Sequence, residues 1–145
     1  MTITEIIQLC VGFVGSLCFG VLFNIRGKKL LAVAVGGLLS CAIYLFLSKF
    51  IPNEAINYFI VAMVVSVFSE IMARVLKTPA TPITITALIP LIPGSALYYT
   101  MAYAFQSDFA KFVEKAIATL SLAAALALGI IIVTALFRLF SRKRK

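Results

Sequence analysis

The sequence contains no histidine and only five acidic residues, so it is poor in the side chains that hold metal ions. The three cysteines all lie inside apolar runs, at Cys10, Cys18 and Cys41. An odd number of cysteines in such places argues against a disulfide framework. The chain also has no nucleophile triad, phosphate-binding glycine loop or EF-hand loop. These absences disfavour an enzyme, and we expect no metal site and no cofactor.

Charged residues are also scarce. They make up 12% of the 145 residues, whereas hydrophobic residues make up 63%. A soluble domain has about 25% charged residues, and a soluble chain of this length has no core large enough for so many apolar side chains. The composition therefore predicts an all-α, multi-pass integral membrane protein, which we expect in the plasma membrane.

Basic residues outnumber acidic ones, which gives a net charge of +8. They lie beside the apolar runs and in the final segment, RLFSRKRK, and no basic face is interleaved with aromatic side chains that would stack on bases. Basic residues beside membrane spans mark the cytoplasmic side and attract anionic head groups. The charge therefore predicts an orientation in the bilayer and no nucleic-acid partner.

Five apolar stretches are long enough to cross a bilayer, which takes about 20 residues. They form one domain over residues 1–145, and we place the spans at 3–23, 30–51, 53–76, 82–105 and within 113–140, where the last helix begins near 108. Thr2 and Glu5 have the spacing of a capping box. Asn53 and Asp108 are predicted N-caps.

The positive-inside rule orients these spans. When the loop of residues 24–29 is cytoplasmic, Lys49, Lys111 and Lys115 lie outside. The other ten of the thirteen basic residues lie inside, namely Arg26, Lys28, Lys29, Arg74, Lys77, Arg138, Arg142, Lys143, Arg144 and Lys145. The rule predicts an outside N-terminus and a cytoplasmic C-terminus.

Small residues recur every four positions in three of the spans. The positions are Gly12, Ser16 and Gly20, then Ala32, Gly36 and Ser40, then Ser121, Ala125 and Gly129. Four-residue spacing puts them on one helix face, where it lets two backbones approach closely. Two interpretations are open, packing within the subunit and a contact face for a partner protein.

Glu70 and Arg74 lie near the cytoplasmic end of the third span, on one helix face, with Ser66 one turn before Glu70. Ionisable groups at membrane depth are costly and usually face a cavity or a partner. A local ion pair that reaches the interface is one interpretation, and a role in proton coupling, gating or substrate passage is the other. Asn24 closes the first span, where a helix terminator is favoured over a ligand. With Glu70 and Arg74 it is the third candidate for proton coupling or gating.

Four of the five prolines fall in one apolar stretch, TPATPITITALIPLIPGSALYYTMAY. Within it, IPLIPG at residues 89–94 lacks two backbone donors and adds a glycine, so a continuous helix is not expected. Broken backbone at membrane depth must be surrounded by protein or line a water-filled cavity. We predict a span of two half-helices, one at residues 83–89 and one through ALYYTMAYAF, with Ser95 as the cap of the second.

The N-terminus of the second half-helix brings a partial positive charge to the break. In secondary transporters such ends bind the anionic groups of substrates. The predicted substrate-binding residues are Pro90, Pro93, Gly94, Ser95, Tyr98 and Tyr99, and Thr84 and Thr86 are expected to add hydroxyls nearby. A kink or re-entrant turn used only for packing is the alternative.

At this motif the chain resembles the threonine/serine exporter family, specifically its C-terminal five-span module. The resemblance rests on RVLKTPATPITITALIPLIPGSALYYTM, with a P-x-x-P-G pattern and a tyrosine soon after it, at Pro90, Pro93, Gly94 and Tyr98 or Tyr99. The segment VLFNIRGKKLLAVAVGGL, which includes Phe23 and Asn24, resembles the first loop of the module. Span order and length agree over nearly the whole chain, but only these two segments are specific.

This resemblance implies a separately encoded small subunit whose partner is a larger five-span subunit with a soluble N-terminal region. It also implies export of threonine and serine or of dicarboxylates, with coupling to the proton gradient. Two other classes stay open: a membrane assembly protein that does not transport, and a homo-oligomeric channel or exporter that acts alone.

Overall fold

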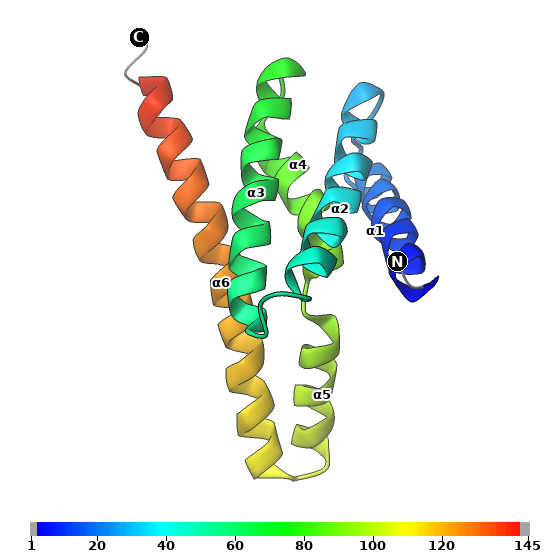
Figure 1. Ribbon diagram of the computed structural model, residues 1–145, viewed down its shortest axis with the longest axis vertical. Helices are drawn as coiled ribbons and strands as arrows, with labels where there is room; N and C mark the ends of the chain where they lie inside the picture. The colour runs from blue at the N-terminus through cyan, green and yellow to red at the C-terminus, as the bar shows by residue number, and fades with distance from the viewer. Residues whose placement is uncertain (1–2, 143–145) are drawn as a thin grey trace.

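The computed structural model describes residues 3–142, with side chains described up to residue 140. Within these residues the protein is all-α and has no strand, as predicted. The elements, drawn in Figure 1, are α1 (Ile3–Leu22), α2 (Lys28–Leu47), α3 (Glu54–Val75), α4 (Ala80–Leu88), the 3-10 helix η1 (Ile89–Leu91), α5 (Gly94–Phe105) and α6 (Phe109–Arg142). The predictions that involve Thr2, the Arg142 side chain and residues 143–145 fall outside the described part of the chain.

Four helices are long and apolar enough to cross a membrane, namely α1, α2, α3 and α6. The segment α4–η1 and helix α5 pass the same test only together, as a pair bent by 61°. The described chain therefore has four candidate spans, or five if the bent pair is one span. Helices α1 to α3 have 20, 20 and 22 residues. At 1.5 Å per residue they are about 30 Å long, which matches the hydrocarbon core of a bilayer.

Two predicted N-caps are confirmed. The Asn53 side chain accepts hydrogen bonds from the N–H groups of Ala55 and Ile56, at the start of α3. Asp108 accepts a hydrogen bond from the Lys111 N–H at the start of α6, and its carboxylate lies 2.9 Å from the Lys111 ammonium. These hydrogen bonds from Lys111, first from its side chain, lower the pKa of Asp108.

Three helices end in the left-handed turn of a Schellman motif. After α1, the Ile25 N–H donates to the Gly20 carbonyl and Asn24 has a φ of 57°. Lys77 after α3 and Ser107 after α5 hold the equivalent position, with φ of 48° and 57°. Asn24 is therefore the terminator of α1, and its side-chain oxygen accepts a hydrogen bond from Arg26 at 2.9 Å.

The faces of small residues pack inside the subunit. Buried Gly12, Ser16 and Gly20 lie on α1, and a Cβ at Gly12 or Gly20 would collide with side chains of α2. Gly36 of α2 faces Ala87 of α4 in the same way. Gly129 of α6 faces Ala62 and the Phe59 carbonyl of α3. Packing within the subunit accounts for these contacts, whereas Ser121 at the far end of the α6 face is exposed.

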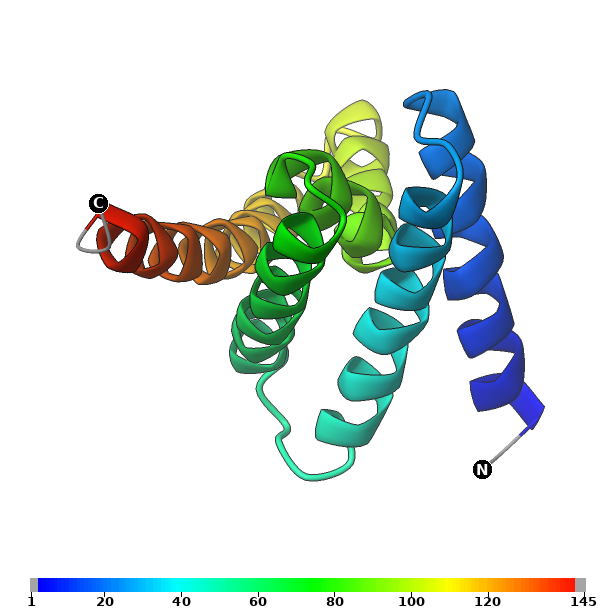
Figure 2. The same ribbon diagram turned by 90° about the horizontal axis from the view of Figure 1, so that it is seen from above.

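The helices form an open layer rather than a closed bundle. Figures 1 and 2 show α1 and α6 at opposite edges, with α2 and α3 between them and α4 packed behind α2 and α3. The central cluster of buried side chains is Val61, Val65, Ala87, Leu88 and Leu91. This cluster joins α3 to α4 and η1, and so it fixes the position of the bent segment.

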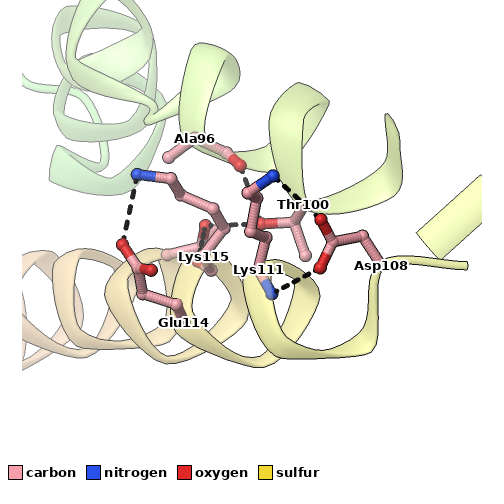
Figure 3. A network of polar contacts seen from close by, with 7 residues as sticks. Ala96, Thr100, Asp108, Lys111, Glu114 and Lys115 are labelled. Atoms are coloured by element: carbon pink, nitrogen blue, oxygen red, sulfur yellow. Dashed lines mark hydrogen bonds and ion pairs between the residues drawn. The ribbon is translucent and has the colours of Figure 1, made fainter. Parts of the chain in front are cut away.

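Helix α5 and the start of α6 form a hairpin that extends beyond the ends of α2 and α3 (Figure 1). Among the described residues, α6 is the only helix against which α5 packs extensively. Figure 3 shows the polar contacts of this hairpin, which include a hydrogen bond between the hydroxyls of Thr100 and Thr119 at 3.1 Å. The Asp108–Lys111 pair closes the turn.

The backbone around the prolines differs from the prediction in detail. The first helical piece begins at Ala80 rather than at residue 83, and η1 carries it on to Leu91. Ser95 is not the cap of α5, because the Leu97 N–H donates to the Pro93 carbonyl and the helix begins at Gly94. Proline at this N-cap position leaves no side-chain hydrogen bond to the helix end.

Candidate functional site

A cavity of about 530 Å³ lies among α3, α4 and α6, at the end of α3 where Glu70 and Arg74 lie. Its charged lining residues are Glu70, Arg74, Lys77 and Arg138. Its polar uncharged residues are Thr78, Thr81, Thr84 and Thr134. A solute the size of an amino acid or a small dicarboxylate fits this volume, and these side chains are the ones that can recognise it.

Helix geometry brings these residues together. Glu70 and Arg74 are four residues apart on α3, and Thr134 and Arg138 are four residues apart on α6, so each pair lies along one helix face. The two helices pack together through Gly129. Lys77 reaches the same cavity from the turn after α3, where its left-handed backbone reverses the chain toward α4.

The electrostatics of this cavity favour an anion. Three basic side chains face it and one acidic side chain, so its formal charge is +2 when Glu70 is ionised. The lining also includes Pro79, Ala80 and Thr81 at the N-terminus of α4. The free N–H groups and dipole of a helix N-terminus add a partial positive charge there. The Arg74 guanidinium lies 4.9 Å from the centre of the Phe137 ring, which holds it beside α6.

The threonines of the cavity present acceptor oxygens. Thr84 donates its hydroxyl proton to the Ala80 carbonyl at 3.1 Å, and Thr134 donates to the Ile130 carbonyl at 2.8 Å. Because these protons are already used, the oxygens are left to accept hydrogen bonds from an ammonium or hydroxyl group. The cavity thus has cationic groups for a carboxylate and acceptors for a second polar group.

The predicted residues at the break lie elsewhere. Pro90 lines an apolar cavity of about 420 Å³, whose polar side chains include Gln8, Tyr44 and Tyr58. Gly94, Ser95, Tyr98 and Tyr99 are exposed on α5, and Pro93 is half-buried. The first cavity is lined by α4 as far as Ile85 and the second by η1 from Ile89, so about one helical turn separates the two linings along this segment.

The sequence therefore predicted one site from residues that the fold places in two separate cavities. Thr84, which we expected near the break, is buried in the lining of the Glu70 cavity. Thr86 donates to the Pro82 carbonyl and is also buried. Ser66 is fully buried one turn from Glu70, and its hydroxyl has no hydrogen-bond partner within residues 3–140.

Asn24 lies at the same end of the molecule as Glu70. It lines a separate cavity of about 300 Å³ together with Arg26, Thr78 and Pro82. Thr78 lines both cavities, so the turn after α1 and the turn after α3 are neighbours. This neighbourhood is compatible with the predicted gating role of Asn24, which remains a prediction.

Sequence reasoning missed Arg138, Lys77 and Thr134 as site residues. From the sequence, Arg138 and Lys77 were predicted only to mark the cytoplasmic side. One sequence feature did point to two of them, because Arg138 follows Thr134 by four residues in an otherwise apolar stretch of α6. The sequence does not indicate that α3 packs against α6. This packing brings Thr134 and Arg138 into the same cavity as Glu70.

The chain was compared with known proteins. A family model described as "Threonine/Serine exporter, ThrE" matches residues 8–136, which is most of the chain and includes the whole cavity except Arg138. No curated protein and no solved structure shows significant similarity.

Proposed function

We propose, from the premise that this chain belongs to the threonine/serine exporter family, that it is a subunit of a secondary transporter which exports small carboxylate-bearing metabolites. The family is one of transporters and not of enzymes. Threonine and serine are the first candidate substrates, and dicarboxylates are the second. Export across the plasma membrane, five spans with an outside N-terminus, and coupling to protons are further parts of this proposal.

The cavity among α3, α4 and α6 is the observation that carries the proposal. Arginine forms paired hydrogen bonds with carboxylates, so Arg74 and Arg138 are suited to hold a substrate carboxylate beside the N-terminus of α4. Thr84 and Thr134 offer oxygens to an amino or hydroxyl group. Under the positive-inside orientation this cavity faces the cytoplasm, which is the side from which an exporter loads its substrate.

Glu70 is the proposed proton carrier. It is partly buried and shares the cavity with the basic side chains that would hold the substrate. A proton on Glu70 would change the formal charge of the cavity from +2 to +3 and so change its affinity for an anion. Proton binding and substrate binding are then linked through one small space, as proton-coupled transport requires.

A second candidate site is the break at Pro90, Pro93 and Gly94, with Ser95, Tyr98 and Tyr99. The apolar cavity beside Pro90 and the two hydroxyls of Tyr44 and Tyr58 favour it as a later point on the same pathway. The exposed tyrosines of α5 need a second subunit before they enclose a solute. We therefore propose that the substrate binds first in the Glu70 cavity.

The transporter is proposed to contain more than one five-span unit. The open layer of helices leaves most residues of α1 and α6 uncovered, and only 17% of the apolar window of each helix is buried. A larger subunit of the same family or a second copy of this chain would close the layer around a pathway. An assembly protein without transport activity is the alternative, and it predicts no role for the charged cavity.

Reconstitution into vesicles tests this function. The chain alone, and the chain co-purified with a candidate larger subunit, would be assayed for flux of labelled threonine, serine and succinate under an imposed pH gradient. We expect saturable flux of at least one of these solutes. Absence of flux for all three in both preparations, with intact insertion, would favour the assembly role.

A further inference from the structure

Two serine hydroxyls are buried beside Glu70 without a hydrogen-bond partner. Ser66 and Ser69 of α3 are both fully buried, and neither hydroxyl has a partner within residues 3–140. Nearly all buried polar groups in proteins are hydrogen-bonded, either to protein or to ordered water, because an unbonded one is costly. The two hydroxyls therefore point to a small polar ligand that bonds to them inside the protein.

Ser66 lies where the Glu70 cavity closes. Residues four apart on a helix lie on one face, and this places Ser66 between Ala62 and Glu70 on α3. Glu70 and Arg74 line the cavity, whereas Ala62 packs against Gly129 of α6. The Ser66 hydroxyl is thus at the inner end of the cavity, one turn deeper than the Glu70 carboxylate.

Ser69 faces α4 at the same level. It lies four residues from both Val65 and Ala73 on α3. Val65 is in the buried cluster that contains Ala87 of α4, and Ala73 is in the cluster that contains Ile83 of α4. Ala73 also lines the Glu70 cavity. The Ser69 side chain therefore points toward α4, beside the wall of this cavity.

Ser66, Ser69 and Glu70 have the spacing that one water molecule can bridge. Side chains three or four residues apart on a helix have Cβ atoms about 5–6 Å apart, which is the span of two hydrogen bonds of about 2.8 Å. A water bonded to Ser66 therefore reaches Ser69 or Glu70 as well, and a buried water usually makes about three such bonds. Neither serine lines the Glu70 cavity or the apolar cavity beside Pro90, so a ligand as large as the solute is not their partner.

The charges around Glu70 favour the serine side as the route for its proton. The cations that face the cavity are Arg74 on α3, Lys77 after it and Arg138 on α6. Residues 80–88 of α4 have no titratable side chain, and no residue of α2 lines this cavity. The three positive charges repel a proton that approaches through the cavity. On the other side of Glu70, α3 has no charged residue between positions 58 and 70.

We propose that Ser66 and Ser69 hold an internal water that passes the Glu70 proton to and from the side of the apolar cavity. Tyr58 lines that cavity and lies on the same face of α3 as Ser66 and Glu70, at four-residue spacing. In the relay, the carboxyl O–H bond breaks and its proton goes to the water oxygen. The water gives one of its own protons to the Ser66 hydroxyl, which passes its original proton to the next water toward Tyr58. Each oxygen keeps its number of protons, and the reverse sequence loads Glu70. The relay rests on the proposed role of Glu70 as proton carrier and adds the route.

Flux in vesicles tests this relay. The double change Ser66→Ala and Ser69→Ala removes both hydroxyls and leaves Glu70 in place. We expect loss of the flux driven by a pH gradient, while exchange of labelled for unlabelled solute continues. Ser16→Ala is the matched control. Ser16 is also fully buried, and its hydroxyl has no partner within residues 3–140, but it packs against Gly37 between α1 and α2. This control should keep the pH-driven flux of the parent chain. Each single change should weaken that flux, which serves if the double variant does not fold.

Infrared difference spectra between low and high pH give a readout that needs no transport. The carboxyl band of protonated Glu70 is identified by its absence in Glu70→Gln. We expect this band in the parent chain and a shifted band in the double alanine variant, because the carboxyl loses the water that the serines hold. Ser16→Ala should leave the band in place. An unshifted band or normal pH-driven flux in the double variant would overturn the relay alone. Absence of the band from the parent chain would overturn the proton role of Glu70 together with the relay.

Discussion

Lys77 has a backbone conformation that lysine rarely adopts. Its φ of 48° closes the Schellman turn after α3, where glycine or asparagine is the usual choice. The left-handed conformation costs a residue with a Cβ about 1–2 kcal/mol. Lysine at this position brings a positive charge to the lining of the Glu70 cavity. The strain is therefore explained if the charge is needed there.

The first prediction follows from this strain. Lys77→Gly should raise the free energy of unfolding by about 1 kcal/mol, because glycine adopts the left-handed conformation freely. It should also lower transport, because the cavity loses one of its cations. Thermal unfolding and solute flux would be measured on the same preparation. Lys77→Arg keeps the charge and should resemble the parent chain in both.

Ser107 provides a control for the stability part of this prediction. It holds the equivalent left-handed position after α5, far from the Glu70 cavity. Ser107→Gly should stabilise the protein by a similar amount. If Lys77→Gly transported as fast as the parent chain, the lysine would be only a turn residue.

The second prediction concerns Glu70. The change Glu70→Gln keeps the shape of the side chain and removes the proton site. We expect an inserted, folded protein in which flux no longer responds to the pH gradient, while exchange of labelled for unlabelled solute continues. Flux that still follows the pH gradient in Glu70→Gln would reduce Glu70 to a structural residue. Arg74→Gln should be compared, because it is expected to impair solute binding rather than coupling.

Among the elements, the bent pair of α4–η1 and α5 has the largest structural consequence. The bend of 61° at the proline motif turns α5 along α6. Gly94 has open space around its Cα and an ordinary φ, so an alanine side chain meets no obstacle there. The direction of α5 therefore depends on the two prolines, which cannot continue a regular helix.

The third prediction is that Pro90, Pro93 and Gly94 changed together to alanine will favour a continuous helix, since proline costs about 3 kcal/mol in a helix interior. A straightened α5 would leave α6 and separate Thr100 from Thr119, whose hydroxyls lie 3.1 Å apart. Cysteines at these two positions should crosslink readily in the parent backbone and poorly in the triple-alanine variant. Equal crosslinking in both would show that packing on α6, and not the prolines, directs α5.

The same experiment separates the two candidate sites. If the break binds substrate, the triple-alanine variant should lose transport even where it stays inserted and stable. If the break only shapes the hairpin, transport should depend on α5–α6 packing. A variant that keeps the crosslink between positions 100 and 119 should then also keep transport. Full transport by a stable, uncrosslinked variant would remove the break from the substrate pathway.

The helices themselves were largely predictable from the sequence. Runs of about 20 apolar residues and the caps at Asn53 and Asp108 placed most helix ends within a few residues, because these signals are local. The exceptions, α4 and the end of α2, lie beside prolines and a loop. The relation between helices was not predictable. Thr84 was assigned to the break, although the packing of α4 on α2 and α3 places it in the lining of the Glu70 cavity. No local pattern distinguishes these two ends of α4.

For the whole molecule, orientation in the bilayer decides what the cavity does. The fourth prediction is that a single cysteine near Asn53 or Asp108, in a background without native cysteines, is labelled from outside intact cells. A cysteine at Lys28 or Lys143 should be labelled only after the membrane is opened. The excess of basic residues on one side is the physical reason. Labelling at Lys28 from outside would reverse the orientation and turn the Glu70 cavity outward.

The central claim is that the cavity among α3, α4 and α6 holds the carboxylate of the exported solute, and Arg138 tests it most directly. Flux of the transported solute would be measured in vesicles against its concentration for the parent chain, Arg138→Gln and the control Lys49→Gln. Lys49 pairs with Glu5 at the other end of the helices, at 2.7 Å, and lies outside the cavity. A hydrogen bond to a charged group contributes about 1.5–3 kcal/mol, so Arg138→Gln should raise the KM about tenfold or more, while Lys49→Gln leaves it unchanged. An unchanged KM in folded, inserted Arg138→Gln would contradict the account.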